Sequence, residues 1–155
     1  MTGRQVEAGQ KVIILLAPEF DEAGMIACLV QMRGASLPVY LVGVVAGLMR
    51  GKHGLMVRPD YSLDELKSEQ AKLIVVPSGM KCSTSLMSDP RIHRLLNSSM
   101  EVGHYVAVLR TAEEAMKLAG FPQQKYQNQM IGQGEADIGS FIRELVHLVS
   151  GVNPI

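Results

Sequence analysis

Runs of apolar residues alternate along the chain with segments of helical periodicity. The first run spans residues 11–17, and later runs span residues 37–45, 73–76 and 105–109. Continuous runs of valine, isoleucine and leucine predict strands that are buried on both faces, as in a parallel sheet covered by helices. Apolar side chains recur at helical spacing in two further segments, which predicts helices over residues 21–33 and 138–149.

Short polar motifs and glycines predict where several helices begin and end. Residues 62–65 and 111–114 both have the S/T-x-x-E form of a capping box, in which two side chains bind free backbone donors at a helix start. A capping aspartate followed by proline at residues 89–90 marks another start. Gly34 and Gly151 stand where a helix end favours a left-handed residue.

The order of these elements predicts one α/β domain. Residues 46–58 form a predicted edge hairpin, whereas residues 77–84 and 120–129 are predicted loops. Strands that alternate with helices predict a doubly wound, mostly parallel sheet sandwiched by helices over residues 11–151, after a polar segment at residues 1–10. Ligands of such sheets bind outside the carboxyl ends of the strands, so the candidate site lies there.

Composition excludes several classes of function. The formal net charge is +0 and 19% of the residues are charged, so the sequence has no electrostatic footprint for nucleic acid. The longest apolar run, residues 37–49, is shorter than the roughly 20 residues of a membrane helix. The first apolar run of the chain is also short and is not followed by the small-residue cleavage pattern of a secretory signal. We therefore expect a cytoplasmic protein without a nucleic-acid or membrane partner.

The sequence also carries no metal or cofactor motif. Cys28 and Cys82 form no zinc-ligand spacing with each other or with a histidine, so we expect two reduced thiols and no metal site. Gly132, Gln133 and Gly134 make too short a motif for a phosphate loop, and no G-x-G-x-x-G is present. We expect no cofactor.

Three stretches in the same order resemble the ThiJ/PfpI superfamily, which is related to class I glutamine amidotransferase domains. Residues 22–34 are similar to the family's first helix with its acidic residue and "RRAG" end. Residues 53–79 are similar to the family's "H-G", "P-D", "L-D-E" and "V-L-P-G-G" motifs. Residues 89–108, followed by the Gly132 motif and the final helix, are similar to the remaining part of the family pattern.

The resemblance implies site residues and also a loss of the family's chemistry. Active members place a cysteine at a strand-to-helix turn, near a glutamate of the first helix, a glycine amide and a histidine. Counting back from the end of the first helix assigns the acid to Glu22, and a shifted alignment assigns it to Gly24. Gly79 matches the amide donor, and the cysteine position falls on Leu109, followed by Arg110.

Leucine cannot act as a nucleophile, and the histidine-bearing region of the family is replaced by residues 120–129. The resemblance therefore implies a pseudoenzyme with a binding, regulatory or stress-related role. A second hypothesis is a hydrolase or a glyoxalase- or deglycase-like enzyme that uses Cys82 with Glu22, because Lys81 would lower the pKa of that thiol. The plain alternative, a cysteine without a base nearby, is favoured. A third hypothesis is a structural assembly subunit.

Two further expectations concern partners. Arg110 would lie beside the free amides of a helix start and could hold a small anionic ligand, although a salt bridge to Glu22, Glu113 or Glu114 is the favoured interpretation. For Glu22, two interpretations are equally supported: an acid in a ligand pocket, or an acidic residue in the first helical turn that complements the helix dipole. The resemblance, together with apolar helix surface left uncovered, predicts a homo-oligomer, most simply a dimer.

Overall fold

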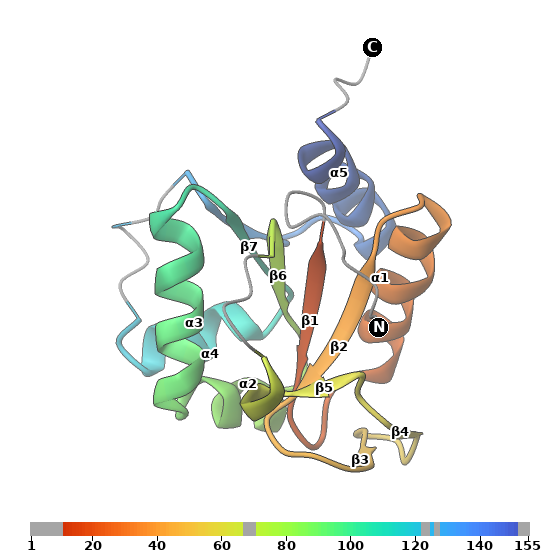
Figure 1. Ribbon diagram of the computed structural model, residues 1–155, viewed down its shortest axis with the longest axis vertical. Helices are drawn as coiled ribbons and strands as arrows, with labels where there is room; N and C mark the ends of the chain where they lie inside the picture. The colour runs from red at the N-terminus through yellow and green to blue at the C-terminus, as the bar shows by residue number, and fades with distance from the viewer. Residues whose placement is uncertain (1–10, 67–70, 122–124, 126–127, 152–155) are drawn as a thin grey trace.

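A six-stranded parallel sheet, in the order β5-β2-β1-β6-β7-β8, forms the centre of the computed structural model (Figure 1). The structure describes residues 11–66, 71–121, 125 and 128–151, so the polar segment 1–10 and part of the segment 120–129 lie outside the described residues. The strands are β1 (Val12–Leu16), β2 (Val39–Gly43), β5 (Tyr61–Ser62), β6 (Leu73–Val76), β7 (Tyr105–Val108) and β8 (Met130–Gly132).

Helices cover both faces of this sheet, which confirms the predicted doubly wound α/β fold. In Figure 1, α1 and α5 lie on one side of the strands, and α2, α3 and α4 lie on the other. Every residue of β1 and β6 is fully buried, as their continuous apolar sequences predict. The helices are α1 (Glu22–Gly34), α2 (Met80–Met87), α3 (Pro90–Glu101), α4 (Ala112–Leu118) and α5 (Ile138–Ser150).

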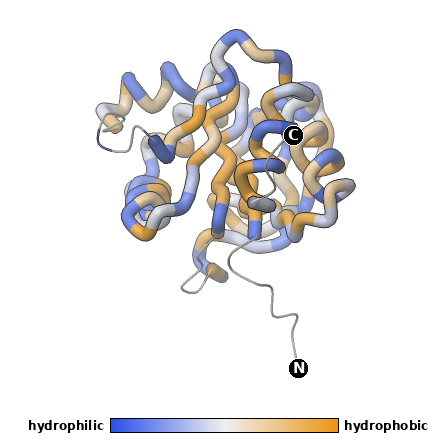
Figure 2. The backbone as a smooth tube through the Cα atoms, turned by 90° about the horizontal axis from the view of Figure 1, so that it is seen from above, coloured by the Kyte–Doolittle hydropathy of each residue, from blue (hydrophilic) through white to orange (hydrophobic). Residues whose placement is uncertain are grey.

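Hydrophobic segments gather along the central strands, whereas hydrophilic segments lie towards the outside (Figure 2). The predicted hairpin is also present: β3 (Met49–Arg50) and β4 (Met56–Val57) form a separate two-stranded antiparallel sheet. Within the described part of the chain, no helix is long and apolar enough to cross a membrane.

Three predicted helix boundaries are confirmed. The Asp89 side chain accepts a hydrogen bond from the backbone nitrogen of Arg91 (2.9 Å) at the start of α3. The capping box of residues 62–65 forms, with Glu65 accepting from the backbone nitrogen of Ser62 (2.9 Å), but it opens only a short 3₁₀ helix, η2 (Leu63–Glu65). Gly151 ends α5 in the left-handed conformation, with φ of 71°.

Two local predictions are wrong. Residues 77–84 are not all loop, because α2 begins at Met80. The buried Ser83 hydroxyl donates to the carbonyl of Pro77 (2.9 Å), and this hydrogen bond offsets the free-energy cost of burying a hydroxyl group in the core. Gly34 is the last residue of α1 and is not left-handed. That conformation belongs to Ser36, with φ of 67°.

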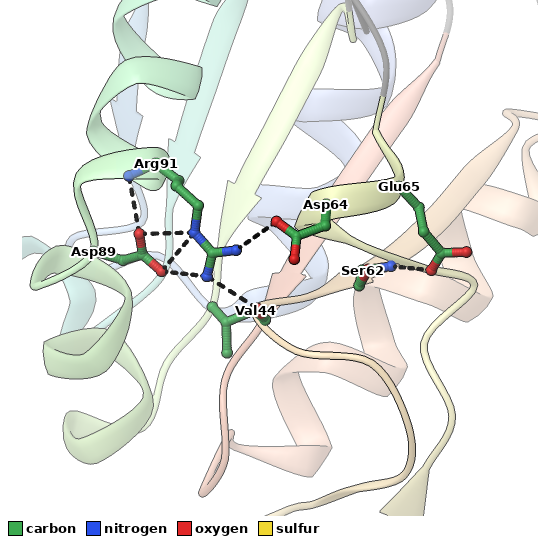
Figure 3. Close-up of polar contacts among 6 residues, drawn as sticks. All are labelled: Val44, Ser62, Asp64, Glu65, Asp89 and Arg91. Carbon is green, nitrogen blue, oxygen red and sulfur yellow. Dashed lines mark hydrogen bonds and ion pairs between the residues drawn. The ribbon is translucent and has the colours of Figure 1, made fainter.

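Arg91 ties three segments together at the carboxyl end of the sheet (Figure 3). Its guanidinium binds the carboxylate of Asp89 (2.7 Å), the carboxylate of Asp64 in η2 (3.0 Å) and the carbonyl of Val44 in the loop after β2 (3.0 Å). Hydrogen bonds from Arg91 lower the pKa of the Asp89 carboxyl group. These contacts hold the loops after β2 and β5 against the start of α3.

Candidate functional site

A cavity of about 510 Å³ opens at the carboxyl ends of β6, β7 and β8, where a parallel sheet is expected to bind ligands. We call it the Thr111 pocket. Its walls come from the loops after these three strands and from the first residues of α1 and α5. They are Asp21, Ala23, Gly24, Ser78, Arg110, Thr111, Gln133, Glu135, Asp137 and Ile138.

Thr111 forms the sharp turn between β7 and α4 in a strained backbone conformation, with φ of 73° and ψ of −30°. A β-branched residue rarely adopts a positive φ, and such strain costs about 1–3 kcal/mol. The Thr111 hydroxyl accepts a hydrogen bond from the backbone nitrogen of Gly79 (3.1 Å). The capping box predicted at residues 111–114 is therefore wrong, because this hydroxyl points across the turn and does not cap α4.

Side chains from two other loops fix the residue before this turn. The buried Gln133 accepts from the backbone nitrogen of Arg110 through Oε1 (3.0 Å) and donates to the carbonyl of Ala136 through Nε2 (3.0 Å). The Ser78 hydroxyl donates to the carbonyl of Arg110 (3.0 Å). Both backbone groups of Arg110 are thus bound by side chains, which holds the strained turn in place. Sequence reasoning noted the motif around Gln133 but missed this role.

Leu109 does not reach the pocket. Its side chain is 1% exposed, and its backbone nitrogen donates to the carbonyl of Val76 (3.0 Å) as part of the sheet. A nucleophile turn is a strained strand-to-helix connection, and here the strained residue beside the Gly79 amide is Thr111. The strained residue of this turn is thus Thr111, two positions after Leu109, and Gly79 contacts it through its backbone nitrogen without lining the Thr111 pocket itself.

Glu22 also lies outside the Thr111 pocket, contrary to the expected ligand site, and its neighbours Asp21 and Gly24 line the walls instead. The buried carboxylate accepts hydrogen bonds from the backbone nitrogens of His53 (2.6 Å) and Leu55 (3.2 Å), and it lies 3.1 Å from Nδ1 of His53. Glu22 therefore anchors the loop between β3 and β4.

The ionised form of Glu22 is strongly favoured. Burial raises the pKa of the Glu22 carboxyl group, but hydrogen bonds from the backbone nitrogens of Glu22, Leu55 and His53 and from the His53 ring lower it to about 2. Because this pKa is below the ordinary value of 4.5, the anchor contributes its full stabilisation above pH 4.5 and loses it as the pH falls towards 2. The anchor is intact at neutral pH.

Cys82 is not the exposed loop thiol that the enzyme hypothesis requires. It lies in the first turn of α2 and is 0% exposed. Burial raises the pKa of its thiol to about 12, although a hydrogen bond with the Ala17 backbone acts in the opposite direction. Burial also raises the pKa of the Cys28 thiol to about 12. Neither cysteine lines the Thr111 pocket.

The Thr111 pocket is acidic. Three carboxylates and one guanidinium give its walls a formal charge of −2. The Arg110 guanidinium donates to the carbonyl of Ala136 (2.9 Å), and the expected salt bridge to Glu22 is ruled out because the hairpin loop holds that carboxylate. Among the residues that the structure describes, no group of three histidine, cysteine, aspartate or glutamate side chains is placed to hold a metal ion.

Comparison with known proteins identifies relatives for most of this chain. The model of the DJ-1/PfpI family matches residues 10–125. Deglycase PfpI of Pyrococcus furiosus is 29% identical over 69 residues, which is 44% of this chain and 42% of that protein. A deglycase of Thermococcus kodakarensis is 32% identical over the same shares of the two chains. The match thus spans less than half the length of these curated relatives.

Solved structures agree with the fold over a longer stretch. DJ-1beta of Drosophila melanogaster superposes with a TM-score of 0.79 at 16% identity, covering 92% of this chain and 91% of that one. A DJ-1 superfamily protein of Salmonella typhimurium superposes with a TM-score of 0.78 at 18% identity and the same coverage. At this identity the likeness establishes the fold.

Proposed function

Because the chain belongs to the DJ-1/PfpI family, as its motifs predicted, we propose that it is a non-catalytic member that binds a small polar molecule in the Thr111 pocket. The observation that carries this proposal is the threonine at the strained turn. Its hydroxyl already accepts the hydrogen bond of the Gly79 amide, the group that the family resemblance assigns to the active site. A binding or regulatory role fits such an occupied turn.

The chemistry of the two thiols supports a role without catalysis. The sequence has only two cysteines, and both are buried, unpaired and carry a pKa raised to about 12. A thiolate is the reactive form of cysteine, so neither residue provides a nucleophile at neutral pH. Two unpaired thiols are also typical of a reducing compartment, which supports a cytoplasmic location.

The size and charge of the Thr111 pocket support a small polar ligand. A volume of about 510 Å³ falls within the range of small-molecule sites. Ser78, Thr111 and Gln133 provide polar groups at its walls, and acidic residues outnumber the single arginine. This charge favours a neutral or cationic molecule over the small anion that Arg110 alone would suggest.

Turnover assays on the purified chain test the absence of catalysis. We expect no processing of a small aldehyde or an aryl ester above the buffer rate, and no difference between the parent and the variants Thr111→Val and Cys82→Ser. We also expect Cys82 to react far more slowly with a thiol reagent than a model thiol does, because it is buried. Turnover that is lost in a folded Thr111→Val or Cys82→Ser variant would show that the chain is an enzyme.

The outer surface of α1 supports self-association. Residues 23–32 include no charged side chain. Met25 is buried against the core on the inner side of the helix, whereas Ile26 and Val30 are 41% and 61% exposed on its outer side. Apart from the exposed Gln31, this stretch is apolar on its outer side as well as on its buried side, and a helix that is apolar all round is normally covered. Leu55 and Met56 of the hairpin, which Glu22 joins to the start of α1, are exposed as well. We propose that a second copy of the chain covers this surface.

A charge placed on α1 tests this dimer. We expect light scattering at tens of micromolar protein, an order-of-magnitude choice, to report a dimer for the parent and a monomer for Val30→Glu. Leu118→Glu is the matched control, because Leu118 is 78% exposed and lies on α4, across the sheet from α1. It should remain a dimer. A parent chain that runs as a monomer contradicts the proposal.

A further inference from the structure

The loop after β1 connects the hairpin to the Thr111 pocket. On one side, the backbone nitrogen of Glu19 donates to the carbonyl of Arg50 (2.9 Å), and that of Lys52 donates to the carbonyl of Phe20 (2.9 Å). On the other side, the backbone nitrogen of Asp21 donates to the carbonyl of Ser78 (3.1 Å). Glu19 adopts a φ of 70°, which is strained for a residue with a side chain.

Two glycines show how tightly these segments are packed. A Cβ atom at Gly51 in the hairpin loop would lie 2.6 Å from the carboxyl group of Glu22. A Cβ atom at Gly79 would lie 2.7 Å from the carbonyl oxygen of Glu19. Because close-packed segments transmit strain, we expect a shift of the hairpin to displace the loop after β1 and, with it, Gly79.

The same path ends at the strained turn. Gly79 donates its backbone N–H to the Thr111 hydroxyl (3.1 Å), and its neighbour Ser78 binds the carbonyl of Arg110 (3.0 Å). A continuous series of hydrogen bonds thus runs from the hairpin loop through residues 18–21 to the wall of the Thr111 pocket. A contiguous network of this kind can carry coupling between distant sites.

We propose that the Glu22-anchored hairpin controls the Thr111 pocket by setting the position of the Gly79 amide, so that a second copy seated on the hairpin regulates ligand binding. The regulatory part rests on the proposed binding function and on the proposed dimer. The mechanical part stands on the contacts alone: loosening the anchor moves the Gly79 N–H away from residue 111.

An introduced thiol reports this movement without any ligand. In Thr111→Cys, the Gly79 N–H would stabilise the thiolate and speed its reaction with an aromatic disulfide reagent, whereas the buried Cys28 and Cys82 react slowly. Adding Gly51→Ala pushes a methyl group against the Glu22 carboxyl group. Gly34→Ala is the matched control, because a Cβ atom there meets nothing within 4 Å.

We expect Gly51→Ala to slow the reaction of the introduced thiol by at least about fivefold at pH 7, and Gly34→Ala to leave it unchanged. Trypsin cleavage after Arg50 or Lys52 should rise in Gly51→Ala, which shows that the hairpin is loosened. If Gly51→Ala does not fold, Glu22→Gln weakens the same anchor more gently. The proposal is overturned if the thiol of both anchor variants reacts as fast as, or faster than, the thiol of the Thr111→Cys single variant.

The result is independent of the proposed binding function. Because the thiol rate needs no ligand, a chain that binds nothing in the Thr111 pocket can still show the coupling. Conversely, if the chain binds a small molecule but the thiol rate is unchanged in the anchor variants, the binding proposal is kept and only the hairpin control is contradicted.

Discussion

Replacing Leu109 by alanine should destabilise the protein by about 2–5 kcal/mol, as expected when a fully buried leucine leaves a cavity. Leu109 is 1% exposed and packs beneath the pocket, where its Cδ1 would lie 3.7 Å from a Cβ atom at Gly24. It is fixed at the end of β7 by the hydrogen bond to Val76. Chemical denaturation followed by far-UV circular dichroism measures the free energy of unfolding.

Leu118→Ala is the control for this experiment, because Leu118 is 78% exposed on α4. It should stay within about 0.5 kcal/mol of the parent, the range of ordinary surface changes. An equally small loss for Leu109→Ala would show that Leu109 is exposed and that the turn is more open than the structure places it. The difference between the two leucines is therefore the quantity to measure.

Gly79→Ala should have a comparable or larger effect, about 2–5 kcal/mol, because two costs add. Gly79 has a φ of 105°, which disfavours any side chain. Its Cβ atom would also lie 2.7 Å from the carbonyl oxygen of Glu19 and 3.1 Å from the backbone nitrogen of Asp21, and backbone atoms cannot rotate away. Thermal and chemical denaturation of the variant measure the sum.

Gly103→Ala separates the two costs. Gly103 has a similar φ of 90°, but a Cβ atom there meets nothing within 4 Å. Only the left-handed conformation is then penalised, by about 1–2 kcal/mol. Equal losses for the two variants would mean that the loop after β1 yields to the new methyl group, and would argue against the tight packing on which the hairpin control depends.

The central sheet could be predicted from the sequence because strands that are buried on both faces have continuous apolar sequences. β1, β6 and β7 lie within the runs at residues 11–17, 73–76 and 105–109. α5 was equally clear, since its buried Phe141, Ile142 and Leu145 recur at helical spacing. α2 was missed because its sequence contains two serines and a threonine, and its buried Ser83 donates a hydrogen bond to Pro77 that sequence does not reveal.

The site was harder to predict, because its geometry depends on partners that are distant in sequence. Glu22 binds the backbone of residues 31 and 33 positions away, so an acid that sequence placed in a ligand site became a structural anchor. Thr111 had the sequence of a helix cap, but its hydroxyl is taken by Gly79, 32 positions earlier. A cavity lies at the edge of the sheet where the sequence placed the candidate site, whereas the residue at the strained turn could be identified only from the structure.

The short outer strands of the sheet have a consequence for aggregation. The sheet ends on β5, which has two residues, and on β8, which has three. Long open edges recruit strands from other molecules and lead to fibrils, and very short edge strands prevent this. The short edge strands of this sheet therefore disfavour an extended cross-β polymer, which is compatible with the closed dimer proposed above.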